Sequence, residues 1–187
     1  MQPTKSARCN TMGWRQDAAR PGGYHAGMGE AGPEFVCDAM LGGLARWLRA
    51  AGYDAEFTYG IDDQRLIRRA VQTAATLLSS DGKLFERNLI RDKTVKALFV
   101  PRELNKLQQL SFVLREFKLP VRPEPRCMAC GGELAEVQKQ SIQGDAPPKA
   151  YAAYEQFWRC SRCGKLLWRG THWNRITARL KEIPGRG

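Results

Sequence analysis

The sequence lacks the features that would direct a protein into or across a membrane. None of its apolar runs approaches the roughly 18 residues that a membrane-spanning helix needs. Residues 1–33 contain three arginines but no apolar segment of the kind found in a secretory signal. We therefore expect a cytoplasmic protein, a reducing compartment in which Cys9 and Cys37 remain free thiols.

Acidic residues are also scarce, with 19 Asp and Glu against 30 Lys and Arg, and the formal net charge is +11 over 187 residues. Residues 127–187 are the most basic part of the chain for their length. Such a charge favours a polyanionic partner, most simply a nucleic acid. The alternative is a soluble protein whose high isoelectric point is unrelated to any polyanionic partner. Nothing in the sequence specifies an oligomeric state.

Four segments differ in composition. Residues 1–33 are rich in glycine, proline and small polar residues, which predicts a disordered leader. Residues 34–120 alternate short apolar runs with helical periodicity, which predicts an α/β fold with a mostly parallel sheet covered by helices. The proline-rich residues 121–126 are interpreted as a linker, and residues 127–183 as a small zinc ribbon with a C-terminal helix.

The cysteines of the last segment carry the strongest signal. Cys127-Met-Ala-Cys130-Gly and Cys160-Ser-Arg-Cys163-Gly are two Cys-x-x-Cys pairs, separated by residues 131–159. Two such turns supply a tetrahedron of thiolates for one zinc, and each glycine suits a turn that needs positive φ. The interval exceeds the usual spacing of about 15–20 residues, which predicts an inserted arm. Two disulfides or two redox-active pairs are the alternatives.

Acidic residues follow the predicted strands of the parallel sheet. Asp38 and Asp81 come after apolar runs, and Asp62 and Asp63 open a predicted helix. Ligands collect at the carboxyl ends of such strands, and carboxylates there suit Mg²⁺ or Mn²⁺. Asp63 has the helical phase of the buried side, whereas Asp62 fits an N-cap. We expect Asp38, Asp63 and Asp81 to converge, although all of them could serve as caps and turn residues instead.

Basic and aromatic residues supply candidate RNA contacts. Arg46 and Arg49 follow Asp38 on the first predicted helix, away from its apolar stripe, and could face a phosphate backbone or simply be solvated. The zinc ribbon ends with Trp168, Arg169, His172 and Trp173, which combine stacking surfaces with positive charge, as single-stranded RNA binding requires. The alternative for the tryptophans is that they cover the ribbon against the larger domain.

Several of these motifs resemble the Mut7-C RNase domain family. The resemblance runs from about residue 34 to 180 and rests on six short stretches: 35–49, 52–54, 62–66, 77–81, 157–160 and 168–173. It implies a PIN-like three-layer nuclease domain fused to a zinc ribbon, with Asp38, Asp63 and Asp81 as the acidic positions. The family often has Thr-Arg-Asp where this chain has Ser79-Ser80-Asp81, and Glu103 is a weak candidate for a fourth carboxylate.

The resemblance and the acidic residues together predict a ribonuclease that uses Mg²⁺ or Mn²⁺, with a structural zinc that helps to hold RNA. Two other functions stay open. One is a non-catalytic RNA-binding or ribosome-binding protein with a vestigial acidic pocket, favoured by the missing arginine and fourth acid. The other is a zinc-stabilised protein scaffold, which the net charge disfavours.

Overall fold

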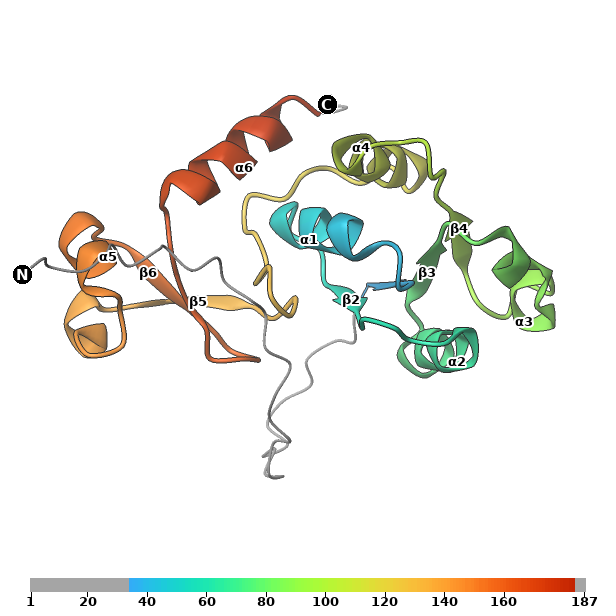
Figure 1. Cartoon of the computed structure of the whole chain (residues 1–187), viewed down its shortest axis with the longest axis horizontal. Helices are drawn as coiled ribbons and strands as arrows, with labels where there is room; N and C mark the ends of the chain where they lie inside the picture. The colour runs from blue at the N-terminus through green and yellow to red at the C-terminus, as the bar shows by residue number, and fades with distance from the viewer. Residues whose placement is uncertain (1–33, 184–187) are drawn as a thin grey trace, which may run out of the picture. The chain divides into compact units, whose positions relative to one another are not determined.

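The computed structural model describes residues 34–183, which fold into an α/β part and a smaller antiparallel part (Figure 1). The expectation of a disordered leader at 1–33, and that of a free thiol at Cys9, lie outside the described residues. The described residues belong to one compact unit of the chain.

The larger part is built on a parallel sheet of four short strands. In the order in which they pair, these are β2 (Ala55–Phe57), β1 (Phe35–Cys37), β3 (Thr76–Ser79) and β4 (Ala97–Phe99). Every neighbouring pair is parallel, with Val36 opposite both Glu56 and Leu77. The expected α/β fold with a parallel sheet is therefore confirmed. The carboxyl ends of all four strands lie at one edge, where the acidic residues were expected.

Helices cover both faces of this sheet, which makes three layers. The helical elements are α1 (Gly42–Ala50), α2 (Asp63–Thr73), η1 (Gly82–Glu86), α3 (Asn88–Arg91) and α4 (Lys106–Glu116). Successive side chains of β1 point to opposite faces. Phe35 and Cys37 therefore pack with α1 and α4, whereas Val36 packs with α2, η1 and α3. No helix in residues 34–183 is long and apolar enough to cross a membrane.

The smaller part is an antiparallel sheet of β5 (Leu134–Val137), β6 (Phe157–Cys160) and β7 (Leu166–Trp168). Between β5 and β6 lie η2 (Lys139–Ile142) and α5 (Pro148–Ala153), which form the inserted arm. A separate apolar cluster of Ile142, Ala146 and Phe157 gives this part its own core. The arm accounts for the long interval between the two cysteine pairs.

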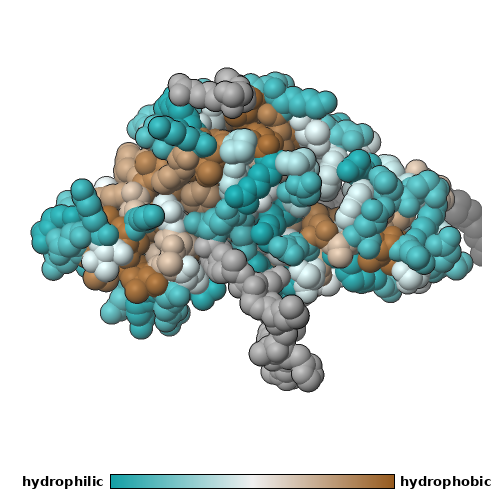
Figure 2. Space-filling model, turned by 180° about the vertical axis from the view of Figure 1, so that it is seen from behind, coloured by the Kyte–Doolittle hydropathy of each residue, from teal (hydrophilic) through white to brown (hydrophobic). Residues whose placement is uncertain are grey.

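The C-terminal helix α6 (Thr171–Lys181) follows β7 but packs on the α/β part. Leu180 is buried in the apolar cluster that contains α1 and α4, and Ile176 and Ile183 lie against it. Seen from behind, hydrophobic residues gather around the end of α6 (Figure 2). The chain thus returns to its first domain after completing the ribbon.

The proline-rich segment at 121–126 is tied to the α/β part along its length. The Arg122 amide donates to the Ala51 carbonyl at 3.0 Å, and the Arg126 amide donates to the Arg49 carbonyl at 2.8 Å. The Arg122 guanidinium also pairs with Glu34 at 2.8 Å and lies over the Tyr53 ring, 4.0 Å from its centroid. This segment is therefore fixed against the α/β part rather than being a flexible linker.

Candidate active site and metal centre

The four cysteines come together where β5 begins and β6 ends, since Leu134 pairs with Cys160. Their sulfur atoms all lie within 4.8 Å of one another. The Sγ atoms of Cys127 and Cys163 are 3.8 Å apart, and those of Cys130 and Cys160 are 3.4 Å apart. A zinc tetrahedron with Zn–S bonds of about 2.3 Å has edges of about 3.8 Å, so these residues fit a zinc ion. The described structure thus contains a four-cysteine group compatible with a zinc ribbon.

Glycine is required in the first of the two turns. The Gly131 amide closes the turn on the Cys127 carbonyl at 2.7 Å, and its φ is +84°. A β-carbon at Gly131 would lie 2.2 Å from a carboxylate oxygen of Asp54. The Gly132 amide then donates to the Cys130 sulfur at 3.4 Å, a contact that stabilises a thiolate. Gly164 has a φ of +70° in the second turn, as the sequence predicted.

Arg49 does not face a phosphate backbone, and the expectation that it contacts RNA is wrong. Its side chain is 5% exposed. Its Nε donates to the Ala55 carbonyl at 2.7 Å, and its Nη1 donates to the carbonyls of Met128 and Ala129, both at 3.0 Å. Burial lowers the pKa of the guanidinium from its ordinary value, but that value is so high that the group stays charged. Arg49 therefore connects α1 to the first cysteine turn.

A second cross-link joins the other cysteine turn to the sheet. Asp54, which precedes β2 and is 2% exposed, pairs with Arg162 at 2.6 Å. The same guanidinium donates to the Cys130 carbonyl at 2.9 Å. Arg49 and Asp54 both lie at the amino edge of the sheet, because α1 returns the chain there to begin β2. The metal centre is therefore docked at the edge opposite Asp38.

We expect Arg49→Ala to destabilise the protein strongly. The substitution leaves three carbonyl acceptors without their donor, at a cost of about 3 kcal/mol. For a chain of this size that corresponds to a fall in Tm of roughly 5–10 °C in calorimetry. The exposed Arg175 on α6 is a matched control. An equal, small change for Arg49→Ala and Arg175→Ala would contradict the structural role of Arg49.

Asp38 lies at the carboxyl edge of the sheet, directly after β1, and is 7% exposed. One carboxylate oxygen accepts from the Met40 amide at 2.7 Å. The other accepts from the Ser79 hydroxyl and, at 3.1 Å, from the Ser80 amide. Three donors thus hold the Asp38 carboxylate in one orientation. A buried carboxylate needs such hydrogen bonds to replace the water it has lost.

Asp81 is connected to Asp38 through Ser79. The Ser79 hydroxyl donates to Asp38 and accepts from the Asp81 amide at 2.9 Å. One oxygen of Asp81 caps η1 by accepting from the Lys83 amide at 3.0 Å. Arg102, which follows β4, donates through Nε to the Ser80 carbonyl at 2.8 Å. The Arg102 guanidinium thus lies beside Ser80, the position at which the family that the sequence resembles often has an arginine.

At the start of α2, Asp62 takes the expected N-cap role, whereas Asp63 is more exposed than its helical phase predicted. The Asp62 carboxylate accepts from the Arg65 amide at 2.9 Å and is the N-cap. Asp63 occupies the first turn, where its oxygen lies 3.6 Å from a guanidinium nitrogen of Arg87. Both side chains of this pair are substantially exposed, so it contributes little stability. Asp63 remains accessible to solvent.

The three carboxylates do not form a close cluster. Within residues 34–183, the four cysteines are the sole group of three or more His, Cys, Asp or Glu ligand atoms within 4.8 Å of one another. Asp38 and Asp81 are linked through one hydroxyl, while Asp63 is engaged with Arg87. The joint metal site of these residues therefore remains a prediction.

Cys37 precedes Asp38 but is not a candidate nucleophile. It is a free thiol with no exposed surface, as the sequence predicted. Burial raises its pKa to about 12. The thiolate, which is the reactive form, is therefore scarce at neutral pH. The candidate reactive groups at this edge of the sheet are therefore the carboxylates.

The ribbon carries an aromatic cluster with a cation, formed by Trp158, Trp173 and Arg169. The two indoles stack with centroids 5.9 Å apart and planes 12° apart. The Arg169 guanidinium carbon lies 5.0 Å from the centroid of Trp158 and 5.9 Å from that of Trp173. Trp158 was not among the predicted contacts. The strand alternation of Phe157 and Trp158 was the available signal, because Phe157 fills the core and Trp158 must point to the opposite side.

The remaining predicted RNA contacts are dispersed. Trp168 is half-buried against Phe157, 6.3 Å between ring centroids, and belongs to the ribbon's own core. This packing contradicts the alternative that Trp168 covers the ribbon against the larger domain. His172 is exposed on the first turn of α6, and Arg46 is exposed on α1. Arg169 and Trp173 alone among the six share one cluster.

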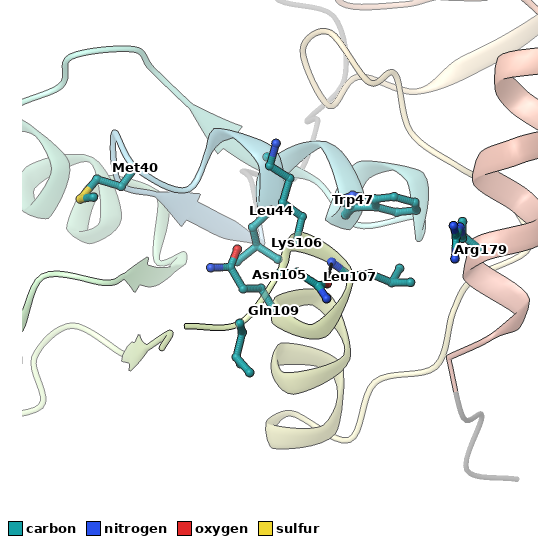
Figure 3. A pocket seen from close by; sticks show the side chains of 10 residues that line it. Met40, Leu44, Trp47, Asn105, Lys106, Leu107, Gln109 and Arg179 are labelled. Carbon is teal, nitrogen blue, oxygen red and sulfur yellow. Dashed lines mark hydrogen bonds between the residues drawn. The ribbon is translucent and has the colours of Figure 1, made fainter. Parts of the chain in front are cut away.

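A pocket of about 610 Å³ is lined by residues of α1, α4 and α6 and by Met40. It begins at Met40, whose amide donates to the Asp38 carboxylate. Figure 3 shows Trp47 of α1 near Arg179 of α6, with Lys106 of α4 close to Leu44. The complete lining is Met40, Gly43, Leu44, Trp47, Leu104, Asn105, Lys106, Leu107, Gln109 and Arg179.

The fold and these sites define a class of protein: an α/β domain with a buried aspartate at the carboxyl edge of its sheet, joined to a four-cysteine module. The chain belongs to the Mut7-C RNAse domain family, whose model matches residues 33–180. It is similar to the human (Homo sapiens) protein named "Exonuclease mut-7 homolog", with 32% identity over 98 residues. That match covers 51% of this chain and 11% of the human protein. No solved structure matches the chain.

Proposed function

We propose that this protein is a metal-dependent ribonuclease that hydrolyses phosphodiester bonds in single-stranded RNA. The observation that carries the proposal is the buried carboxylate of Asp38, held by three donors at the carboxyl edge of the sheet and linked through Ser79 to Asp81. Keeping a charged group buried in this way is costly, and such groups concentrate at functional sites. Membership of an RNase domain family supports the same reaction class.

The donor set suits a hard divalent cation. Carboxylate oxygens are the ligands that Mg²⁺ and Mn²⁺ prefer, and Mg²⁺ is commonly held by one or two carboxylates with several waters. Asp38 and Asp81 would supply such ligands directly, and Asp63 through water or after release from Arg87. When bound, the cation would polarise the scissile phosphate and lower the pKa of an attacking water.

The protein's own residues have separable tasks in this proposal. Asp38 presents a charged oxygen in a fixed orientation, because the Met40 and Ser80 amides and the Ser79 hydroxyl restrain it. Ser79 keeps Asp81 in register with Asp38. Arg102 places a positive charge beside Ser80, where it can meet a phosphate oxygen of the substrate.

The ribbon supplies RNA contacts at a distance from the proposed site of cleavage. Its zinc has a structural role, because four thiolates leave no open position. The cluster of Trp158, Trp173 and Arg169 offers ring surface to a base and positive charge to a phosphate. RNA that contacts both this cluster and Asp38 has to be a chain of several nucleotides.

We expect Trp173→Leu to weaken RNA binding by about fivefold to 150-fold, because stacking of one base is worth about 1–3 kcal/mol. Arg169→Gln is expected to weaken it by a smaller factor and to reduce its dependence on salt. Fluorescence anisotropy with labelled single-stranded RNA measures both. Arg175→Gln, an exposed arginine on α6, is the matched control for charge. Unchanged affinity in Trp173→Leu would show that the aromatic cluster does not contact RNA.

The proposed activity is tested by incubating the purified full chain with end-labelled single-stranded RNA, with Mn²⁺ or with a chelator of hard cations. We expect shortened products with Mn²⁺ alone. The product ladder distinguishes endonucleolytic from exonucleolytic cleavage. Double-stranded RNA of the same sequence tests the preference for single strands.

The second candidate function is a non-catalytic RNA-binding or ribosome-binding protein. The lack of a close carboxylate cluster among residues 34–183 favours it, since Asp38, Asp63 and Asp81 do not share one set of ligand atoms within 4.8 Å. In that case the protein binds RNA with the same salt dependence as the proposed ribonuclease, but it does not cut RNA with any divalent cation. Binding measured together with cleavage therefore separates the two functions.

A further inference from the structure

The pocket between α1, α4 and α6 is positively charged. Of its ten lining residues, two are cationic, Lys106 and Arg179, and none is acidic. Lys106 forms no ion pair with any other residue in the range 34–183. Arg179 lies 3.2 Å from Glu182, but both side chains are more than half exposed, so the pair is weak and can be exchanged for a ligand.

The shape of the pocket brings these charges toward an aromatic surface. Lys106 lies across the first turn of α1, where a β-carbon at Gly43 would be 2.7 Å from its side chain. Gly43 thus allows the lysine to approach the helix closely. Trp47, one turn further along α1, is half-buried and points toward Arg179 (Figure 3). Asn105 and Gln109 add polar groups from α4.

We propose that this pocket binds one nucleotide of an RNA chain, with its phosphate between Lys106 and Arg179 and its base against Trp47. Cationic side chains, an aromatic face and the absence of carboxylates suit a phosphate joined to a base better than an apolar or cationic ligand. The volume of about 610 Å³ lies within the range of ligand pockets.

The position of the pocket gives the nucleotide a defined relation to Asp38. Met40 contributes its amide to Asp38 and its side chain to the pocket wall. An RNA chain would have to continue from this nucleotide along the pocket, past Met40, to reach Asp38 at the carboxyl edge of the sheet. The inference rests on the proposed function in that the ligand is RNA, but it concerns binding and can be tested without cleavage.

The test measures RNA affinity in the full chain carrying Asp38→Asn, so that the RNA stays intact. We expect Lys106→Gln to weaken binding roughly fivefold to tenfold and to lower the salt slope by about 1, as for loss of one phosphate contact. Lys96→Gln is the matched control, because Lys96 is exposed before β4, at the opposite edge of the sheet. Equal affinities of the two variants would overturn the proposal.

A second measurement follows the tryptophan itself. The chain has five tryptophans, and an NMR spectrum resolves their indole N–H signals, with Trp47 assigned from Trp47→Phe. We expect a short oligonucleotide to shift the Trp47 signal in the parent protein and not in Lys106→Gln. A nucleoside monophosphate that produces the same shift would mean that the pocket takes free nucleotides as well as RNA. No shift at Trp47 with either ligand would refute the base contact.

These readouts separate the two proposals. If the parent chain fails to cut RNA but Lys106→Gln still loses affinity, the pocket stands and the proposed ribonuclease activity fails. If the parent cuts RNA and Lys106→Gln binds as tightly as Lys96→Gln, the activity stands and the pocket fails.

Discussion

Asp38→Asn is expected to reduce RNA cleavage about a thousandfold while the protein still binds RNA. The change keeps the shape of the side chain but removes the charge that would hold a divalent cation. A catalytic cation contributes several kcal/mol to the transition state, and each 1.4 kcal/mol corresponds to a factor of ten in rate. Single-turnover cleavage of end-labelled RNA in Mn²⁺ measures the loss.

The surroundings of Asp38 determine the controls. An amide at this position still accepts from Met40, but its NH₂ group would face the Ser80 amide, so some loss of stability is expected. Asp92→Asn makes the same chemical change at a largely exposed position and should leave both cleavage and Tm unchanged. Comparable cleavage by the parent and Asp38→Asn, with both proteins folded, would identify the activity as a contaminant.

Cys160→Ser is expected to abolish zinc binding and unfold the β5–β7 sheet. The parent protein should carry one zinc per chain by elemental analysis after dialysis. The binding of zinc to such sites is worth about 10–16 kcal/mol and is coupled to folding. The small core around Phe157 does not compensate for a loss of that size. Hydrogen exchange should show the amides of β6 and β7 losing protection in the variant.

Cys37→Ala is the matched control for this experiment. It removes a buried thiol that lies outside the four-cysteine group, so the zinc content should stay at one equivalent. Some loss of stability from the small cavity is expected, without loss of metal. A disulfide within either cysteine pair in the freshly purified protein would refute the zinc site.

The local features of this protein were accessible from its sequence. The cysteine pairs, the turns with positive φ and the N-cap at Asp62 depend on residues a few positions apart. The parallel sheet followed from the alternation of strand and helix, and is confirmed. The buried residues of α4 likewise recur along one face, the periodicity typical of a helix that covers a sheet.

The features that the sequence did not reveal depend on contacts between distant segments. The surroundings of Arg49 were predicted wrongly because its acceptors at Met128 and Ala129 are about 80 positions away in the sequence. Trp158 was overlooked because its stacking partner, Trp173, belongs to a different element. The connection of Asp38 to Asp81 through Ser79 also requires two neighbouring strands to be in register. Periodicity and spacing within one segment contain no information on such pairs.

The buried Arg49 has a consequence for how this protein can be divided. A fragment ending near residue 126 would retain the sheet but lose the carbonyls of Met128 and Ala129, and it would also lose Leu180 from the cover of α1 and α4. The fragment would then combine a poorly solvated cation with an uncovered apolar surface, which favours aggregation. Dissection by expression of separate halves is therefore a poor route to assigning activities. Point substitutions in the full chain preserve the unit in which Arg49, the four-cysteine group and the sheet depend on one another.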